Sequence, residues 1–310
     1  MDTILLFYSY FHLEYPERVQ KWQLELCKEL GLKGRIIIAH EGINGTLGGA
    51  TEKIERYKKA VENHPLFKGI DFKESSGVGN DFPRLRVVIK NEVVNLGLDP
   101  KTITADKGGK HLTPQEVHEL LSNKPENLVV LDARNKVEWA IGKFTNAITP
   151  NIETFRELPE FINQNEEQFK DKQVLMYCTG GIRCERASAF LKSKNITQEV
   201  YQIEGGIQRY TEQYPDGFFR GKNYVFDGRV AVKVNDDILS NCLHCKQPCD
   251  EYVNCLNGVC NEHFVCCKQC VANHNQTCRI ECNELVTTGA VQTRPVRYRN
   301  ACIIDEKSKS

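Results

Sequence analysis

The sequence carries no excess charge of either sign and contains no long apolar run. Its 310 residues include 41 Lys and Arg and 41 Asp and Glu, so the formal net charge is zero and does not by itself indicate a nucleic-acid partner. No apolar stretch reaches the roughly 18 residues that a membrane-spanning helix needs. The first residues also lack the basic segment and cleavage site of a secretory signal. We therefore expect a cytoplasmic protein without a membrane partner.

A dinucleotide-binding glycine motif is absent as well, whereas cysteine is abundant. No Gly-x-Gly-x-x-Gly follows a predicted strand, so no Rossmann-type cofactor site is visible. The chain has 14 cysteines, and ten of them lie between Cys242 and Cys282. In a cytoplasmic protein this usage indicates metal ligands or redox chemistry rather than a disulfide framework. The abrupt change in composition places the start of a separate module near residue 225.

Hydrophobic patterning divides the chain into three predicted modules, residues 1–100, 111–220 and 221–310. The first has predicted strands and helices in the order β-α-β-α-β-β, which favours a ferredoxin-like (acylphosphatase-like) α+β domain. Between a predicted strand and a helix, residues 40–49 are rich in glycine. This stretch is typical of a hairpin, and an anion-binding turn is the alternative.

The second module alternates buried-type strands with helices, which predicts an α/β domain with a mainly parallel sheet. Functional side chains of such a sheet lie at the carboxyl ends of the strands. Asp132 and Arg134 follow one predicted strand, and Cys178 follows the next. These three residues are therefore candidates for a site.

Cys178 is the first candidate for chemistry, because it stands between a predicted strand and a helix predicted over residues 186–194. Free backbone N–H groups and the helix dipole at such a position stabilise the nucleophilic thiolate. Four residues separate Cys178 from Arg183, one fewer than in the phosphate-binding loop of tyrosine phosphatases. The shorter loop predicts a smaller anion, such as the terminal sulfur of a persulfide.

The central module resembles the rhodanese superfamily. The residues that carry the resemblance occur in the rhodanese order: Asp132-Ala133-Arg134, Glu138, Gly142, the loop Cys178-Thr179-Gly180-Gly181-Ile182-Arg183, and Gly205-Gly206. The resemblance implies that Cys178 carries sulfur as a persulfide, that the loop N–H groups and Arg183 stabilise its anion, and that Asp132 and Arg134 brace the loop. Cys184 is either a buried structural thiol or one that resolves an oxidised or persulfidated Cys178.

Over nearly its whole length the chain resembles the rhodanese-domain tRNA uridine(34) hydroxylases. Three segments carry this resemblance: Glu41–Thr46, Tyr177–Glu185 and Tyr224–Val230. It implies oxygen-dependent 5-hydroxylation of the wobble uridine of tRNA, with Cys178 as the active-site cysteine and O2 as co-substrate. No electron donor is indicated. We hypothesise that a thiol or persulfide at Cys178 adds to uridine C6 and makes C5 nucleophilic.

Two other functional classes stay open. The Cys178 loop alone indicates a thiosulfate or persulfide sulfurtransferase, and the cysteine-rich segment is compatible with a non-catalytic redox or scaffold protein.

The third module is predicted to bind metal. Eight cysteines form four close pairs: Cys242 and Cys245, Cys255 and Cys260, Cys267 and Cys270, and Cys278 and Cys282. Two four-cysteine structural zinc sites would use all eight, with either sequential or cross-braced pairing. Zinc would fold a segment too poor in apolar residues to form a core alone. Disulfides and an iron–sulfur cluster are the alternatives.

The best local candidate for RNA contact is the segment with Arg294, Arg297, Tyr298 and Arg299. Arginine near phosphate and tyrosine under a base suit RNA, and a solvated tail is the alternative. The glycine-rich stretch of the first module is the other candidate.

Overall fold

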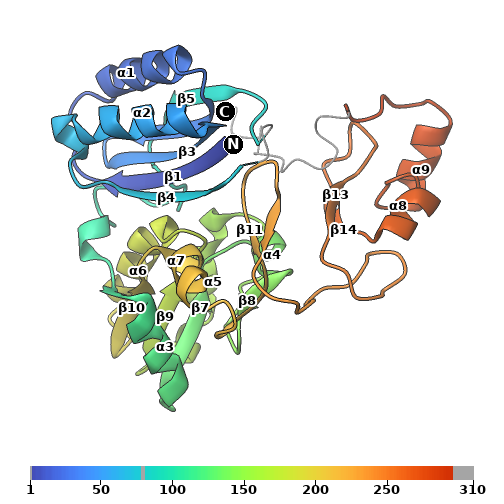
Figure 1. Cartoon of the computed structure of the whole chain (residues 1–310). Helices are drawn as coiled ribbons and strands as arrows, with labels where there is room; N and C mark the ends of the chain where they lie inside the picture. The colour runs from blue at the N-terminus through green and yellow to red at the C-terminus, as the bar shows by residue number, and fades with distance from the viewer. Residues whose placement is uncertain (1, 78–80, 296–310) are drawn as a thin grey trace.

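The computed structural model describes residues 2–77 and 81–295 and contains three modules (Figure 1). The expected fold class is confirmed: an acylphosphatase-like sandwich, an α/β domain with a parallel sheet, and a small cysteine-rich module follow one another along the chain. The exact domain boundaries stay a prediction. None of the helices in the described ranges is long and apolar enough to cross a membrane.

The N-terminal module is a five-stranded sheet with two helices on one face. Its elements are β1 (Asp2–Tyr10), α1 (Pro16–Glu29), β2 (Lys33–Ala39), β3 (Gly42–Ala50), α2 (Thr51–Glu62), the 3-10 turn η1 (Pro65–Phe67), β4 (Asp71–Ser76) and β5 (Leu85–Ile89). The strand order is β4-β1-β3-β2-β5. The order of elements is therefore β-α-β-β-α-β-β, one strand more than the sequence predicted before the second helix.

The additional strand is the glycine-rich stretch, which forms β3 rather than an anion-binding turn. It makes a hairpin with β2 and lies between β2 and β1 in the sheet. Glycine is required there because Phe7 crosses the strand: a Cβ at Gly45 would lie 2.2 Å from the Phe7 ring. The low side-chain volume of β3 thus makes room for the aromatic core.

Strand β1 has two different faces, as side-chain alternation along a strand requires. Leu5 and Phe7 belong to the core beneath the helices. Leu6, Tyr8 and Tyr10 lie on the opposite face, which is directed at the central module (Figure 1).

The central module is built on a four-stranded parallel sheet in the order β6-β10-β9-β7. Its elements are η2 (Ala105–Lys107), β6 (Lys110–Leu112), α3 (Pro114–Asn123), β7 (Leu128–Asp132), α4 (Lys136–Trp139), β8 (Gly142–Phe144), η3 (Phe155–Glu157), α5 (Leu158–Gln164), η4 (Glu166–Gln168), β9 (Gln173–Tyr177), α6 (Ile182–Ser193), β10 (Glu199–Ile203) and α7 (Gly206–Gln213). One apolar cluster joins the sheet to α5 and α6, and another joins it to α3 and α7. The sheet is therefore covered on both faces.

Helix α6 begins four residues earlier than its sequence predicted. Ile182 and Arg183 directly follow the glycines of the loop, so the sequence pattern placed them in that loop. In the structure both lie in the first turn of α6. The helix N-terminus is consequently part of the Cys178 loop itself.

The C-terminal module is tied to the central one by strand pairing. Its elements are β11 (Phe219–Tyr224), β12 (Ala231–Lys233), β13 (Tyr252–Asn254), β14 (His263–Val265), α8 (Lys268–Asn273) and α9 (Ile280–Thr287). Strand β11 pairs with β8 of the central module and with β12. Beyond this hairpin, the buried core consists largely of cysteines.

Candidate functional site

Cys178 lies directly after β9, in a loop whose backbone surrounds its sulfur. The Sγ accepts a hydrogen bond from the backbone N–H of Gly181 at 3.2 Å, and the residue is fully buried. Gly181 has a φ of +99°, which a residue with a side chain rarely adopts. The loop therefore needs glycine at this position to direct its N–H groups at the sulfur.

The environment of Cys178 favours the thiolate. Burial raises the pKa of the thiol, but the hydrogen bond from Cys184, the charge of Arg183 and the backbone N–H groups of Arg183 and Cys184 outweigh burial and lower the pKa from 9.0 to about 6. Burial and the adjacent Cys178 sulfur raise the pKa of Cys184 well above its usual value. At neutral pH the pair consists of a thiolate and a thiol that donates to it.

This shift predicts a thiolate titration near pH 6. The sulfur of Cys178 is protonated below about pH 6 and ionised above it. Because the folded-state pKa is the depressed one, the contribution of the thiolate to stability is complete above the ordinary thiol pKa of 9.0 and is lost as the pH falls from there to about 6. The difference in ultraviolet thiolate absorbance between the wild type and Cys178→Ala should titrate with that midpoint. Cys184→Ala should raise the midpoint, since it removes a hydrogen-bond donor.

Cys27 provides the control for this titration. It is buried in the N-terminal module, and burial raises its pKa to about 12. Cys27→Ser should therefore leave the midpoint unchanged, and a Cys178 midpoint near 9 would contradict the assigned electrostatics.

The Glu138 carboxylate holds Arg183 in place. In the sequence, Glu138 is recognisable only as part of the rhodanese pattern. The Arg183 guanidinium donates two hydrogen bonds of 2.6 Å to Glu138 and one of 3.3 Å to the Thr179 hydroxyl. Burial raises the pKa of Glu138, but Arg183 outweighs it and holds that pKa below its usual range. The bidentate pair fixes the guanidinium beside the thiolate loop.

Asp132 and Arg134 lie at the end of β7 and are fully buried. The Arg134 guanidinium donates bidentately to Asp132, at 2.9 and 2.7 Å, and also to the carbonyl oxygen of Gly142 at 2.6 Å. The backbone N–H of Ala133 donates to the carbonyl of Tyr177, next to Cys178. This arrangement links β7, β8 and the start of the Cys178 loop.

The N-terminal module covers the Cys178 loop, which sequence reasoning did not predict. A Cβ at Gly180 would lie 2.8 Å from the side chain of Leu6, and one at Gly181 would lie 2.8 Å from the hydroxyl of Tyr8. The Tyr10 hydroxyl donates to the carbonyl of Ile182 at 3.3 Å. No local signal in β1 distinguishes these side chains from ordinary strand residues.

Glu185 continues this contact as a buried polar cluster. It accepts hydrogen bonds from the Tyr8 hydroxyl at 3.1 Å and from Gln202 at 3.1 Å, and pairs with His111 at 3.0 Å. Glu185 is the last residue of the Tyr177–Glu185 motif, so the sequence could have identified it as a candidate site residue.

The eight paired cysteines form two groups of four. Cys242, Cys245, Cys267 and Cys270 make one group, and Cys255, Cys260, Cys278 and Cys282 make the other. Within each group the sulfurs lie within 4.8 Å of one another. The first pair therefore joins the third and the second joins the fourth, which is the cross-braced alternative. Among the described cysteines none forms a disulfide.

Arg294 does not present its side chain to solvent. It is 9% exposed, and its guanidinium donates to the backbone carbonyls of Cys255 and Cys260. This position corrects the expectation of phosphate contact for Arg294, because its donors are used inside the module. Arg297, Tyr298 and Arg299 lie outside the described residues.

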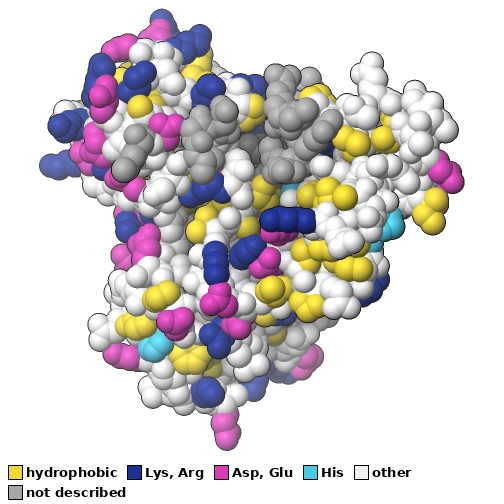
Figure 2. All heavy atoms as spheres, turned by 45° about the vertical axis from the view of Figure 1, so that its right-hand side comes forward, with side chains coloured by type: hydrophobic (Ala, Val, Ile, Leu, Met, Phe, Trp, Pro, Cys, Tyr) yellow, Lys and Arg dark blue, Asp and Glu magenta, His cyan; other side chains and the backbone are white. Residues whose placement is uncertain are grey.

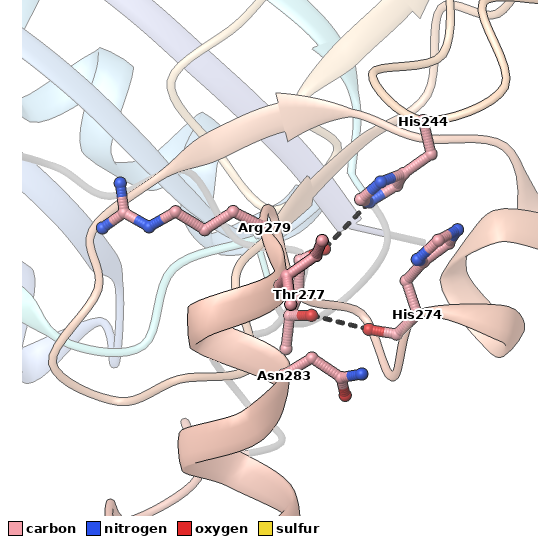
Figure 3. Close-up of a pocket in the computed structure, with 6 residues that line it drawn as sticks. His244, His274, Thr277, Arg279 and Asn283 are labelled. Atoms are coloured by element: carbon pink, nitrogen blue, oxygen red, sulfur yellow. Dashed lines mark hydrogen bonds between the residues drawn. The ribbon is translucent and has the colours of Figure 1, made fainter.

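A hollow on the C-terminal module contains two stacked imidazoles (Figure 3). The rings of His244 and His274 are 3.9 Å apart, and His244 is hydrogen-bonded to the carbonyl of Thr277. Arg279 and Asn283 also line it. The hollow contains no residue of the Cys178 loop, so it is not the candidate active site.

Three family models together match most of the chain. The UPF0176 acylphosphatase like domain matches residues 3–93, the rhodanese-like domain matches 113–213, and the rhodanase C-terminal domain matches 220–283. Among curated relatives, a protein named tRNA uridine(34) hydroxylase of Corynebacterium jeikeium is 41% identical over 293 residues, or 91% of this chain and 94% of the relative. A tRNA uridine(34) hydroxylase of Bacillus mycoides is 41% identical over 288 residues, or 90% of this chain and 88% of the relative.

Proposed function

The chain belongs to the tRNA uridine(34) hydroxylase family, and on that premise we propose that it hydroxylates C5 of uridine 34 in tRNA. The observation that supports this most directly is the low-pKa thiol of Cys178 in a narrow loop of backbone N–H groups. Its fully buried sulfur is suited to covalent chemistry in a site from which water is excluded.

In the proposed reaction the thiolate of Cys178 adds to C6 of the uracil ring. The addition gives C5 the electron density that an oxidant requires, and loss of the C5 proton with departure of the sulfur restores the double bond. With O2 as oxidant, replacing C5–H by C5–OH takes up two electrons and two protons, and the second oxygen atom leaves as water. An external thiol reductant supplies the two electrons and two protons, because two thiol groups release both when they are oxidised to a disulfide.

The neighbours of Cys178 have supporting roles in this proposal. Cys184 and the loop N–H groups of Gly181 and Arg183 hold the thiolate between additions. Arg183 places its charge beside the uracil carbonyls as negative charge develops there. Glu138 keeps the guanidinium in position through the bidentate pair.

We propose zinc as the metal of the two cysteine groups. In a tetrahedral site with Zn–S bonds of about 2.3 Å, the sulfurs lie about 3.8 Å apart. The Sγ atoms of Cys245 and Cys267 are 3.8 Å apart, and those of Cys260 and Cys278 are 3.7 Å apart. The residues therefore fit a structural ion that would hold α8 and α9 on the module.

The second candidate function is sulfur transfer, which the rhodanese-like domain alone would support. Nucleoside mass spectrometry of tRNA from cells that lack the protein separates the two. Loss of 5-hydroxyuridine derivatives, with thiolated bases intact, is the result that we expect. Loss of thiolated bases instead would favour the sulfurtransferase, and intact modification would favour a scaffold role.

We also propose a cytoplasmic location, in keeping with a tRNA substrate.

A further inference from the structure

The loop between β11 and β12 presents one exposed aromatic ring beside the candidate active site. Phe226 is 41% exposed, while its neighbours Tyr224, Asp227 and Val230 are at most 7% exposed. The ring lies 5.9 Å from the guanidinium carbon of Arg183, the residue that closes the Cys178 loop. The ring packs edge-on against the buried Tyr224, with the two ring centroids 5.4 Å apart, and the rest of it is exposed to solvent.

The loop that carries Phe226 is fixed on both sides. Arg229 forms a bidentate pair with Asp227 and also donates to the Ser75 hydroxyl at 2.9 Å and to the carbonyl of Ser76 at 3.1 Å. The backbone N–H of Gly228 donates to the carbonyl of Asp81 at 2.8 Å. The C-terminal module is therefore attached to the N-terminal one directly over the central domain.

The same loop contains backbone strain. Val230 has a φ of +64°, a conformation that a β-branched residue rarely adopts. Its N–H still donates to the carbonyl of Asp227, and its carbonyl accepts from Val225, so the hydrogen bonds of the hairpin hold it there. Strain of this kind is maintained where the surrounding contacts fix one loop conformation, and functional sites are common among such places.

The Cys178 loop reaches the surface on the side of this ring. Cys178, Gly180 and Gly181 are buried, whereas Thr179 is partly exposed, and the Thr179 hydroxyl accepts from Arg183. In the face shown in Figure 2, hydrophobic, basic and acidic side chains lie next to one another where the modules meet. A planar group placed on Phe226 would thus have Arg183 and Thr179 beside it.

We propose that Phe226 is a stacking platform for a nucleobase of the tRNA at this site, and so a substrate-positioning residue. The inference rests on the proposed function for the identity of the substrate. Every base offers a π-face to an aromatic ring, and a guanidinium beside the stack adds a polar contact to the base edge. One partly exposed ring beside Asp227, Gly228 and Arg229 is too small an apolar surface for a protein interface.

Tests of this platform use the full-length protein and a tRNA transcript with uridine at position 34. Phe226→Ala should weaken transcript binding by about 5- to 100-fold in fluorescence anisotropy, the range for loss of one aromatic stacking partner. Phe226→Trp should retain binding and show quenching of its added indole fluorescence by the bound transcript. Tyr15→Ala is the matched control, since Tyr15 is 49% exposed and its ring contacts Arg18.

Two outcomes distinguish this inference from the proposed function. If Phe226→Ala binds the transcript as tightly as the wild type, the platform is wrong even where hydroxylation occurs. If Phe226→Ala binds weakly but the wild type forms no 5-hydroxyuridine, the platform stands and the hydroxylase function fails. An unchanged thiolate titration of Cys178 in Phe226→Ala shows that the substitution leaves the catalytic loop intact.

Discussion

Replacement of Cys178 by alanine is expected to reduce formation of 5-hydroxyuridine at least about 1,000-fold, because it removes the low-pKa thiolate that the loop surrounds. Alanine also leaves the backbone N–H of Gly181 without its acceptor. The measurement is nucleoside mass spectrometry of a U34 transcript after incubation with purified protein, O2 and a thiol reductant. Substrate binding should survive, since the sulfur is buried and the proposed base platform lies on another module.

Cys27→Ala is the matched control for this loss. Cys27 is also fully buried, but it belongs to the core of the N-terminal module and has no contact with the loop. It should lower stability without changing the chemistry. Full hydroxylation by Cys178→Ala would rule out covalent addition to C6 and would leave the loop as a structural element.

Removal of the metal is expected to unfold the C-terminal module and to abolish activity. Structural zinc contributes about 10 to 16 kcal/mol of apparent binding free energy in small zinc-dependent folds, and here eight cysteines, seven of them buried or half-buried, would lose their ions. Plasma mass spectrometry should find two zinc ions per chain. After chelation, limited proteolysis should degrade the segment beyond residue 234 and leave the N-terminal and central modules intact.

The cross-braced pairing predicts which cysteines hold the same ion. A double substitution Cys242→Ser and Cys267→Ser removes two ligands of the same group, so it should release one ion and keep the other. Cys249→Ser is the control, because Cys249 is buried and belongs to neither group. Stoichiometric iron with absorbance near 400 nm would show that the cysteines hold an iron–sulfur cluster instead of zinc. A C-terminal module that stays folded without metal would refute the prediction.

Loss of the C-terminal module should affect catalysis through the contacts that it makes with the Cys178 loop. The Tyr252 hydroxyl donates to the carbonyl of Val137, the residue before Glu138, which in turn holds Arg183. The metal groups are thus connected to the loop by packing rather than by chemistry. Through this connection the proposed structural ions would support a candidate nucleophile that lies in another module.

The candidate nucleophile and its loop were accessible from the sequence because they are local. Cys178, Gly181 and Arg183 lie within six consecutive residues, and the position after a buried strand determines that their N–H groups meet at one point. The close spacing of the cysteine pairs was equally local. Both features follow from short-range geometry that does not depend on the rest of the chain.

Errors at the level of single elements came from glycine. The stretch that became β3 has little side chain to bury, so its hydrophobic pattern was weak, and only Phe7 packing over Gly45 shows why it is a strand. The same weakness of signal delayed the predicted start of α6 from Ile182 to Arg186.

By itself the sequence determined the order of the three modules, the thiol in its glycine loop and the presence of cysteine pairs. Only the tertiary structure decided which cysteines share a group, that Glu138 holds Arg183, and that Tyr8 and Phe226 reach the Cys178 loop from the two flanking modules. The physical reason is separation along the chain. Contacts between residues far apart in the sequence depend on how sheets and modules pack, and no local pattern of residues encodes that packing.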